Sequence, residues 1–395
     1  MMKVFIVGAG AVASVLAKEL AKEKSVVGVV CSSNHIAKAR EFIKEGGKIS
    51  IVEVDASDIH DIKEKAHGSD LLINASLPHF NINVMAAALD IGANYQDLDS
   101  ELLDLRNPEQ FEFEKKYQKG RAVGLINAGI SPGMTNLFIA EACDNLDSVH
   151  EIKIRGLEEQ KAKEFIFTWS PHVTIDELKA RPLVLINGKF ELAKPLKGEE
   201  DYVFPGKYGG KFKVYDVYGD EISTIPKYIK VKNMSYKAGG SDIEFSKILN
   251  DAKMLSDEPI EISGIHIAPI EFLSRLLGSS VPTPEKIIEL MKKGIIIDGV
   301  YIASIECIGK KKGKNVNIRY DLVYPTAKEV MKKCPGATYI SYATGIAAAV
   351  FAMNIDAIKK KGVFPAEALE KPVRTQIIKD LKKKGVKITK RISYI

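Results

Sequence analysis

The sequence lacks the features that mark several classes of protein. Its four cysteines, Cys31, Cys143, Cys307 and Cys334, lie far apart and form no Cys-x-x-Cys pair. We therefore expect neither a disulfide framework nor a metal site, and a reducing cytoplasm is the expected compartment. No apolar run reaches the roughly 20 residues that a membrane span needs, so no membrane contact is expected. Because the chain begins directly with an apolar segment typical of a strand, no signal peptide is expected either.

A strong excess of one charge is also missing. The chain of 395 residues carries 57 basic and 51 acidic residues, and the net charge of +6 is spread along it. This excess is too small to predict nucleic-acid binding, although it suits an anionic cofactor or substrate. The dense basic run 310–314 has no aromatic residues between its lysines and is typical of a solvated turn. The length exceeds that of one ordinary core, which predicts two domains.

The most informative segment is 3–20. Residues 4–7 form an apolar run rich in β-branched side chains, which favours a buried strand. A Gly-x-Gly-x-x-Ala motif and a helical apolar spacing follow. Gly8 permits a tight turn, Gly10 has no Cβ to keep a pyrophosphate away, and the helix start faces the phosphates. The alternative is a purely structural turn. The motif predicts a dinucleotide site that includes Gly8, Ala9, Gly10, Ala11 and Val12.

The end of the second predicted strand, 26–31, bears on the choice of cofactor. A site that prefers NAD usually places an Asp or Glu here, on the ribose hydroxyls. This chain instead has Ser32 and Ser33, and Lys38 and Arg40 follow. Hydroxyls with nearby cations suit a 2′-phosphate, so we predict NADP, with NAD possible. The alternative is that these serines only cap the next helix and that Lys38 and Arg40 are solvated, which would be compatible with either cofactor.

Further strands are predicted at 49–54, 70–75, 95–98 and 122–126, which indicates a doubly wound parallel sheet. Ligands bind outside the carboxyl ends of such strands. The residues that follow these strands are therefore candidates for binding the cofactor, namely Asp55, Ala56, Asn74, Ala75, Gly129, Pro132 and Gly133. His79, Asp97 and Asp99 follow strands on the same side. His79 and Asp97 are candidates for handling a proton, although a lone His is more often structural.

Four motifs together resemble the saccharopine dehydrogenase family, and they follow the family's order along nearly the whole chain. They are residues 8–13, the strand end 70–78, Gly-Ile-Ser-Pro-Gly at 129–133 with Thr-Asn at 135–136, and Phe-Thr-Trp-Ser-Pro at 167–171. The resemblance implies hydride transfer between NAD(P) and a C–N bond of a lysine-derived amino acid. A lysine 6-dehydrogenase or a carboxynorspermidine dehydrogenase is the alternative enzyme. An NADP-binding sensor or scaffold without turnover is the alternative outside enzymes.

The resemblance also implies the fold. We expect an α/β protein whose Rossmann domain spans 1–128 and is rejoined by 338–395. Residues 129–337 would form an α+β domain on an antiparallel sheet, with the active site in the cleft. This second domain would bind a small amino-acid substrate and carry a homodimer contact.

The resemblance further implies substrate residues. Ser131, Trp169, Arg181 and Lys237 occupy positions in its motifs, together with Asp99 at the strand end. Arg181 would clamp a carboxylate or pair with a structural acid, and Trp169 would wall the pocket or fill a core. Lys237 would bind a carboxylate, transfer a proton, or be solvated. Saccharopine reductases have an Arg near Glu221, another at Lys237, and an Asp at Ser131. These departures weigh against a substrate with three carboxylates.

Overall fold

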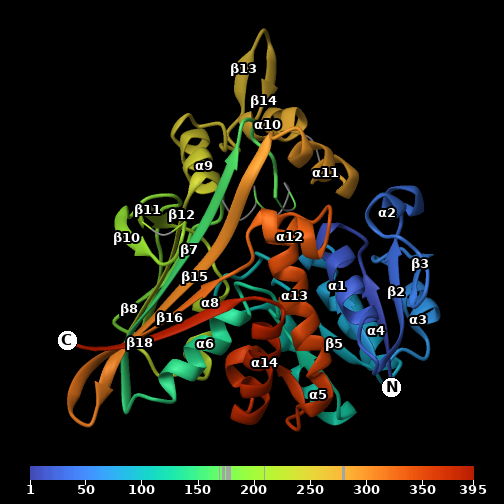
Figure 1. Ribbon diagram of the computed structural model, residues 1–395, viewed down its shortest axis with the longest axis horizontal. Helices are drawn as coiled ribbons and strands as arrows, with labels where there is room; N and C mark the ends of the chain where they lie inside the picture. The colour runs from blue at the N-terminus through green and yellow to red at the C-terminus, as the bar shows by residue number, and fades with distance from the viewer. Residues whose placement is uncertain (169, 171–173, 175–178, 209, 278–280) are drawn as a thin grey trace.

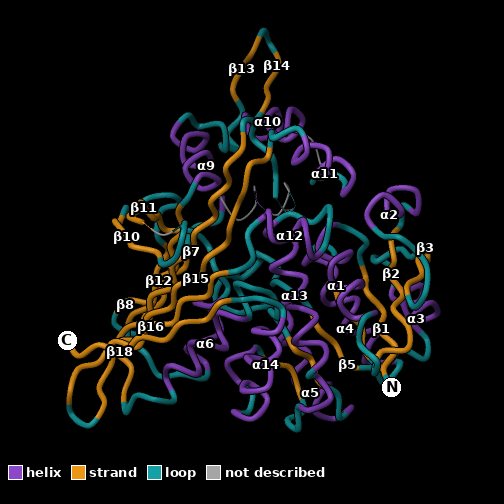
Figure 2. Tube along the Cα trace, viewed as in Figure 1, coloured by secondary structure: helices purple, strands orange, loops and turns teal. Residues whose placement is uncertain are grey.

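The computed structural model describes residues 1–395 except 169, 171–173, 175–178, 209 and 278–280. It contains a parallel sheet covered by helices and a larger mixed sheet, and Figures 1 and 2 show them as two adjoining parts of one molecule. This arrangement confirms the expected fold class, a Rossmann-type sheet with a second α+β part.

The first sheet has seven strands that all pair in parallel. Their order is β17-β6-β5-β4-β1-β2-β3. The strands are β1 (Met2–Val7), β2 (Val26–Ser33), β3 (Ile49–Glu53), β4 (Leu71–Asn74), β5 (Asn94–Gln96), β6 (Val123–Leu125) and β17 (Gly362–Phe364). The order reverses between β1 and β4, so the carboxyl ends of these two strands mark the place where a ligand crevice is expected.

Helices cover both faces of this sheet. Val4 and Ile6 of β1 belong to one apolar core, whereas Phe5 and Val7 belong to another. This alternation explains why the whole segment is apolar. The helical elements of this part are α1 (Ala11–Ala21), α2 (Ile36–Phe42), α3 (Ile59–Ala66), η1 (Pro78–Phe80), α4 (Asn81–Asp90), η2 (Glu109–Phe113), α5 (Glu114–Gly120) and α6 (Met134–Cys143).

The second sheet is built around two long strands, β7 (Ser148–Ala162) and β15 (Ile296–Lys311), which run side by side in Figure 1. Its pairs are antiparallel except β12 with β7, so the sheet is mixed rather than purely antiparallel. The other strands are β8 (Leu183–Ile186), β9 (Lys189–Leu192), β10 (Glu200–Phe204), β11 (Gly210–Asp216), β12 (Asn233–Gly239), β16 (Lys314–Val323) and β18 (Lys387–Tyr394).

Shorter elements flank this sheet. A separate hairpin of β13 and β14 projects from one end of the molecule (Figure 1). The elements are α8 (Glu221–Thr224), η3 (Ile225–Lys227), α9 (Ser241–Asp251), β13 (Ile260–Ile262), β14 (Ile265–Ile267), α10 (Pro269–Leu277), α11 (Pro284–Lys292) and α12 (Ala327–Lys333).

The C-terminal segment is shared between the two sheets. It comprises α13 (Tyr339–Met353), η4 (Ile355–Ala357), β17, η5 (Ala366–Ala368), α14 (Lys371–Lys383) and β18. Helix α13 packs on α1, and a Cβ on Gly345 would lie 2.6 Å from the Cβ of Val15. Strand β17 extends the parallel sheet, but β18 pairs with β16. The expectation that all of 338–395 rejoins the Rossmann part therefore needs correction at β18; the other domain boundaries stay a prediction.

Two features are absent among the described residues. None of their helices combines the length and apolarity that crossing a bilayer requires. No group of three or more His, Cys, Asp or Glu side chains among them is placed to hold a metal ion.

Candidate functional site

The glycine turn between β1 and α1 is closed on one side and open on the other. Gly8 has a φ of +115°, and a Cβ there would lie 2.6 Å from the carbonyl oxygen of Ala75. A Cβ on Gly10, in contrast, would have no neighbour within 4 Å. Helix α1 begins after Gly10 and has no acidic residue in its first turn. The turn therefore fits a pyrophosphate, which would accept hydrogen bonds from the first N–H groups of the helix.

The carboxyl end of β2 offers hydroxyls to this turn. The backbone N–H of Gly8 donates to the carbonyl of Ser32 at 3.0 Å, while the buried Ser32 hydroxyl has no hydrogen-bond partner among the described residues. The Ser33 hydroxyl accepts from the backbone of His35 at 3.1 Å. Lys38 is exposed, whereas Arg40 is paired with Glu45 at 3.1 Å. An unpartnered hydroxyl and an exposed cation suit a polar ribose or a 2′-phosphate.

The remaining cofactor candidates lie at neighbouring strand ends. Asp55 accepts hydrogen bonds from the backbone and hydroxyl of Ser57, which keep its pKa below the usual range, and Ala56 lies within that turn. The Asn74 side chain accepts from the Ser76 backbone at 3.0 Å and thereby shapes the loop after β4. Asp55, Ala56 and Asn74 thus stabilise these turns, and a direct role toward the cofactor stays a prediction.

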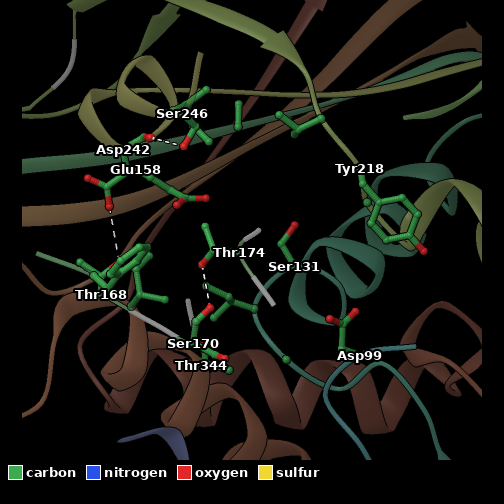
Figure 3. A pocket seen from close by; sticks show the side chains of 18 of the residues that line it. Asp99, Ser131, Glu158, Thr168, Ser170, Thr174, Tyr218, Asp242, Ser246 and Thr344 are labelled. Carbon is green, nitrogen blue, oxygen red and sulfur yellow. Dashed lines mark hydrogen bonds between the residues drawn. The ribbon is translucent and has the colours of Figure 1, made fainter. Parts of the chain in front are cut away.

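A cavity of about 260 Å³ lies beside the first turn of α1, where Val12 lines it, and Figure 3 shows some of its other lining side chains. On the nucleotide side it is lined by Val12, Ala75, Ser76, Pro78, Asp99, Gly129, Ser131 and Pro132. On the side of the second sheet it is lined by Glu158 of β7, Tyr236 and Ala238 of β12, Asp242 of α9 and Tyr301 of β15. Cofactor and substrate candidates therefore share one continuous space. Gly133 follows directly, with a φ of +120° where α6 begins.

The cavity is acidic. Four of the described lining residues are carboxylates, namely Asp99, Glu158, Asp220 and Asp242, and none of the described lining residues is Lys, Arg or His. Burial raises the pKa of Asp242 to about 6. Hydrogen bonds from the Tyr339 and Thr168 hydroxyls lower this pKa and so oppose part of the shift. Burial raises the pKa of Glu158 to about 8, and the charge of Asp242 adds to this shift. The cavity wall therefore favours a positively charged ligand.

Glu221 holds Ser131 at the cavity wall. The hydroxyls of Ser131 and Thr135 both donate to Oε1 of Glu221 at 2.6 Å. Its other oxygen, Oε2, is buried without a hydrogen-bond partner in the described part of the chain, and burial raises the pKa of this carboxyl. In the sequence, Glu221 stands out only as the position near which saccharopine reductases have an arginine. A buried acid in the four-residue helix α8 gave no local signal of this contact.

Asp97 lies behind the cavity rather than in it. The Tyr95 hydroxyl and the Gln110 amide donate to its Oδ2 at 2.9 and 3.0 Å, and the Asn127 backbone donates to Oδ1 at 2.6 Å. Burial raises the pKa of Asp97 to about 8. Asp97 does not line the cavity, so the structure supports a role in holding the loop after β6 rather than direct proton transfer.

Lys237 and His79 do not reach the cavity. Tyr236 and Ala238 line it, and strand alternation directs Lys237 to the opposite face of β12. There the Lys237 Nζ lies 3.5 Å from Asp216 and 3.7 Å from Glu200, and its side chain is 14% exposed. His79 is exposed, and the centroid of its ring lies 3.8 Å from the centroid of the Phe80 ring. Neither placement supports the predicted catalytic role, and the substrate contact of Lys237 needs the same correction.

Arg181 and Trp169 are two further substrate candidates. Arg181 is exposed and donates to the carbonyl of Leu192 at 2.8 Å, away from the described cavity wall. It therefore does not act as the predicted carboxylate clamp in this arrangement. Trp169 lies outside the residues that the structure describes. Asp99 and Ser131 are the predicted substrate residues that do line the cavity.

Comparisons with known proteins cover nearly the whole chain. Residues 4–124 match the family model "saccharopine dehydrogenase NADP binding domain", and residues 129–386 match "saccharopine dehydrogenase C-terminal domain". The chain is 26% identical to carboxyaminopropylagmatine dehydrogenase of Synechocystis sp. over 385 residues, which cover 94% of this chain and 93% of that protein. It is also 26% identical to carboxynorspermidine synthase of Vibrio cholerae over 400 residues, which cover 93% and 92% of the two chains.

Two solved structures share the fold. Saccharopine dehydrogenase (L-Glu forming) of Saccharomyces cerevisiae matches with a TM-score of 0.74 and 16% identity, and the match covers 100% of both chains. Homospermidine synthase of Legionella pneumophila, solved in complex with NAD, matches with a TM-score of 0.63 and 14% identity, over 100% of this chain and 91% of that one.

Proposed function

The chain belongs to the saccharopine dehydrogenase family of NAD(P)-dependent oxidoreductases, and we propose that it transfers hydride at a C–N bond of a carboxylated polyamine. This choice favours the carboxynorspermidine dehydrogenase alternative over a lysine 6-dehydrogenase or a saccharopine reductase. Both curated relatives named above carry an amine in their printed names, agmatine in one and norspermidine in the other.

The acidic cavity carries this proposal. Its described wall presents Asp99, Glu158, Asp220 and Asp242 and no cation. A substrate with three carboxylates would have no partner there and would be repelled, since like charges in a poorly solvated space interact strongly. The proposed substrate carries one carboxylate but several ammonium groups, so its net charge is positive and complements the wall.

We assign roles by position. The nicotinamide ring, when bound, supplies or accepts the hydride. Gly10 and the start of α1 bind the pyrophosphate, and Ser32, Ser33 and Lys38 bind the adenosine ribose and its 2′-phosphate. Ser131 donates its hydroxyl proton to Glu221, so its Oγ accepts a hydrogen bond from the reacting nitrogen, and the proton released there passes through this hydroxyl to Glu221. Tight placement of the substrate supplies most of the remaining rate enhancement.

The test is a screen of the purified protein with NADP and NAD against carboxynorspermidine, saccharopine and lysine. We expect reduction of NADP with carboxynorspermidine and little or none with saccharopine. Turnover with lysine or saccharopine alone would overturn the substrate assignment. Tight NADP binding without turnover of any of the three compounds would favour a sensor or scaffold.

We further propose a cytoplasmic homodimer. The four cysteines are free thiols, which suits a reducing compartment. Strands β13 and β14 and helix α10 carry exposed apolar side chains, and exposed apolar surface is typical of a contact region. They are Ile260, Ile262, Ile265, Phe272 and Leu276. Light scattering on the purified protein tests the dimer, and a single mass near 43.5 kDa would contradict it.

A further inference from the structure

Two carboxylates from different elements face the same end of the cavity. Glu158 is near the end of the long strand β7, and Asp242 is in the first turn of α9. Figure 3 shows both on one side of the cavity, with Asp99 on the other and Ser131 between. The charge of Asp242 acts on Glu158, so the two groups are electrostatic neighbours.

The two acids differ in their partners. Asp242 accepts hydrogen bonds from Tyr339 at 3.1 Å, Ser241 at 3.2 Å and Thr168 at 3.4 Å, so its carboxylate is fixed. The Glu158 carboxylate accepts no hydrogen bond and forms no ion pair within the described part of the chain, yet it lines the cavity. Glu158 is half-buried, and a partly desolvated carboxyl without a protein partner is costly unless a ligand completes it.

The wall beside these acids is apolar. Phe165 and Phe245 stack with ring centroids 4.1 Å apart, and both line the cavity. Leu249, Leu255 and Leu273 line the same space. Apolar side chains next to a pair of acids suit a short methylene chain that ends in a cation.

We propose that Glu158 and Asp242 form a subsite for a second cationic group, an ammonium or guanidinium, at the end of the substrate away from the reacting nitrogen. This inference rests on the proposed function and extends it, since it assigns the recognition of the distal cation to two residues. The methylene chain would lie along Phe165 and Phe245. Asp99 and Ser131 would remain for the reacting end.

The subsite has a consequence for pH. The cation binds the ionised form of Glu158, whose pKa is raised to about 8, so binding near pH 7 must release a proton. Affinity for the cation should therefore increase as the pH rises from 7 toward 8.5, by up to tenfold per pH unit. Among the described residues, the other titratable groups facing Glu158 are Asp242, whose pKa is about 6, and the uncharged hydroxyls of Tyr236, Tyr301 and Tyr339.

The experiment measures binding without turnover. Calorimetry on the complex with NADP compares α,ω-diamines of three to five methylenes, and agmatine, with the monoamine of each length. We expect at least one dication to bind ten- to a hundredfold more tightly than its monoamine, the usual effect of one desolvated charged contact. Glu158→Gln should remove that preference and the proton release, and Asp242→Asn should weaken it.

The matched control is Glu244→Gln, which removes a charge from the exposed face of the same helix, α9. It should retain the preference. Equal affinity of the wild-type protein for dications and monoamines, or an unchanged preference in a folded Glu158→Gln variant, would overturn the subsite. Cofactor binding and turnover are measured on the same samples. A wild-type protein that turns over carboxynorspermidine but shows no preference for dications refutes this inference alone, whereas dication binding without any hydride transfer refutes the proposed function alone.

Discussion

Gly10 and Gly8 stand two residues apart in one turn, yet their substitution should have opposite consequences. A Cβ on Gly10 has no neighbour within 4 Å, and Gly10 has a φ of −88° that any residue adopts. Gly10→Ala should therefore cost only about 0.5–1 kcal/mol of stability, the difference between Gly and Ala before a helix. The added methyl group would occupy the space of the pyrophosphate. Loss of one or two charge-assisted hydrogen bonds, about 1.5–3 kcal/mol each, should lower NADP affinity at least tenfold.

Gly8→Ala should act on the fold instead. Its φ of +115° is unfavourable for any side chain, and the new Cβ would lie 2.6 Å from the Ala75 carbonyl oxygen. We expect a loss of about 2 kcal/mol or more and a clear drop in the melting temperature. The control is Gly28→Ala in β2, whose Cβ would meet only a side-chain carbon of Lys3 at 3.8 Å.

The assay combines thermal unfolding with fluorescence titration of NADPH on the same preparations. We expect normal melting with weak cofactor binding for Gly10→Ala, and early melting for Gly8→Ala. Normal NADPH affinity in a folded Gly10→Ala variant would refute the placement of the pyrophosphate, and with it the physical basis of the cofactor site.

Three further predictions follow from contacts in the site. Ser33→Asp should change the ratio of kcat/KM for NADP to kcat/KM for NAD at least tenfold in favour of NAD, because the new carboxylate repels a 2′-phosphate. If this ratio were unchanged, the ribose would lie elsewhere. Glu221→Gln should lower kcat about tenfold or more and shift the pH profile of kcat, because Glu221 orients Ser131, while the affinity for NADPH should stay the same. A change in KM alone would contradict this positioning role. Lys237→Ala should destabilise the fold by about 1–3 kcal/mol with KM unchanged, because it leaves Asp216 without its close cation, while Glu200 keeps its pair with Arg155; a raised KM with normal melting would return Lys237 to the site.

The parts of the fold that local rules determine could be predicted from the sequence. Each glycine of the β1–α1 turn has a backbone or steric reason that lies within a few residues of it, and the apolar run 4–7 requires two covered faces. The carboxyl ends of parallel strands then place Asp99 and Ser131 at the cavity without knowledge of side-chain packing.

Other features depend on contacts between distant segments. Side chains alternate between the two faces of β12, so the face on which Lys237 lies depends on the register of this strand. A shift of one residue would turn the Lys237 side chain toward the cavity. Strand β18 joins the second sheet by pairing with β16. In this register Arg391 lies opposite Arg319, which is about 70 residues earlier in the chain. The pattern of 387–394 alone does not specify which sheet it extends.

The charge of the cavity is the clearest case of such a distant effect. The chain as a whole is basic, with a net charge of +6, which suggested an anionic ligand. Lys237 and Arg155, however, lie on β12 and β7 where they pair with Glu200, and neither lines the cavity. The acids that line it come from four separate segments, at Asp99, Glu158, Asp220 and Asp242. Because a ligand responds to the side chains around it rather than to the total charge, the local excess of carboxylates, and not the net charge of the chain, is the basis of the proposed cationic substrate.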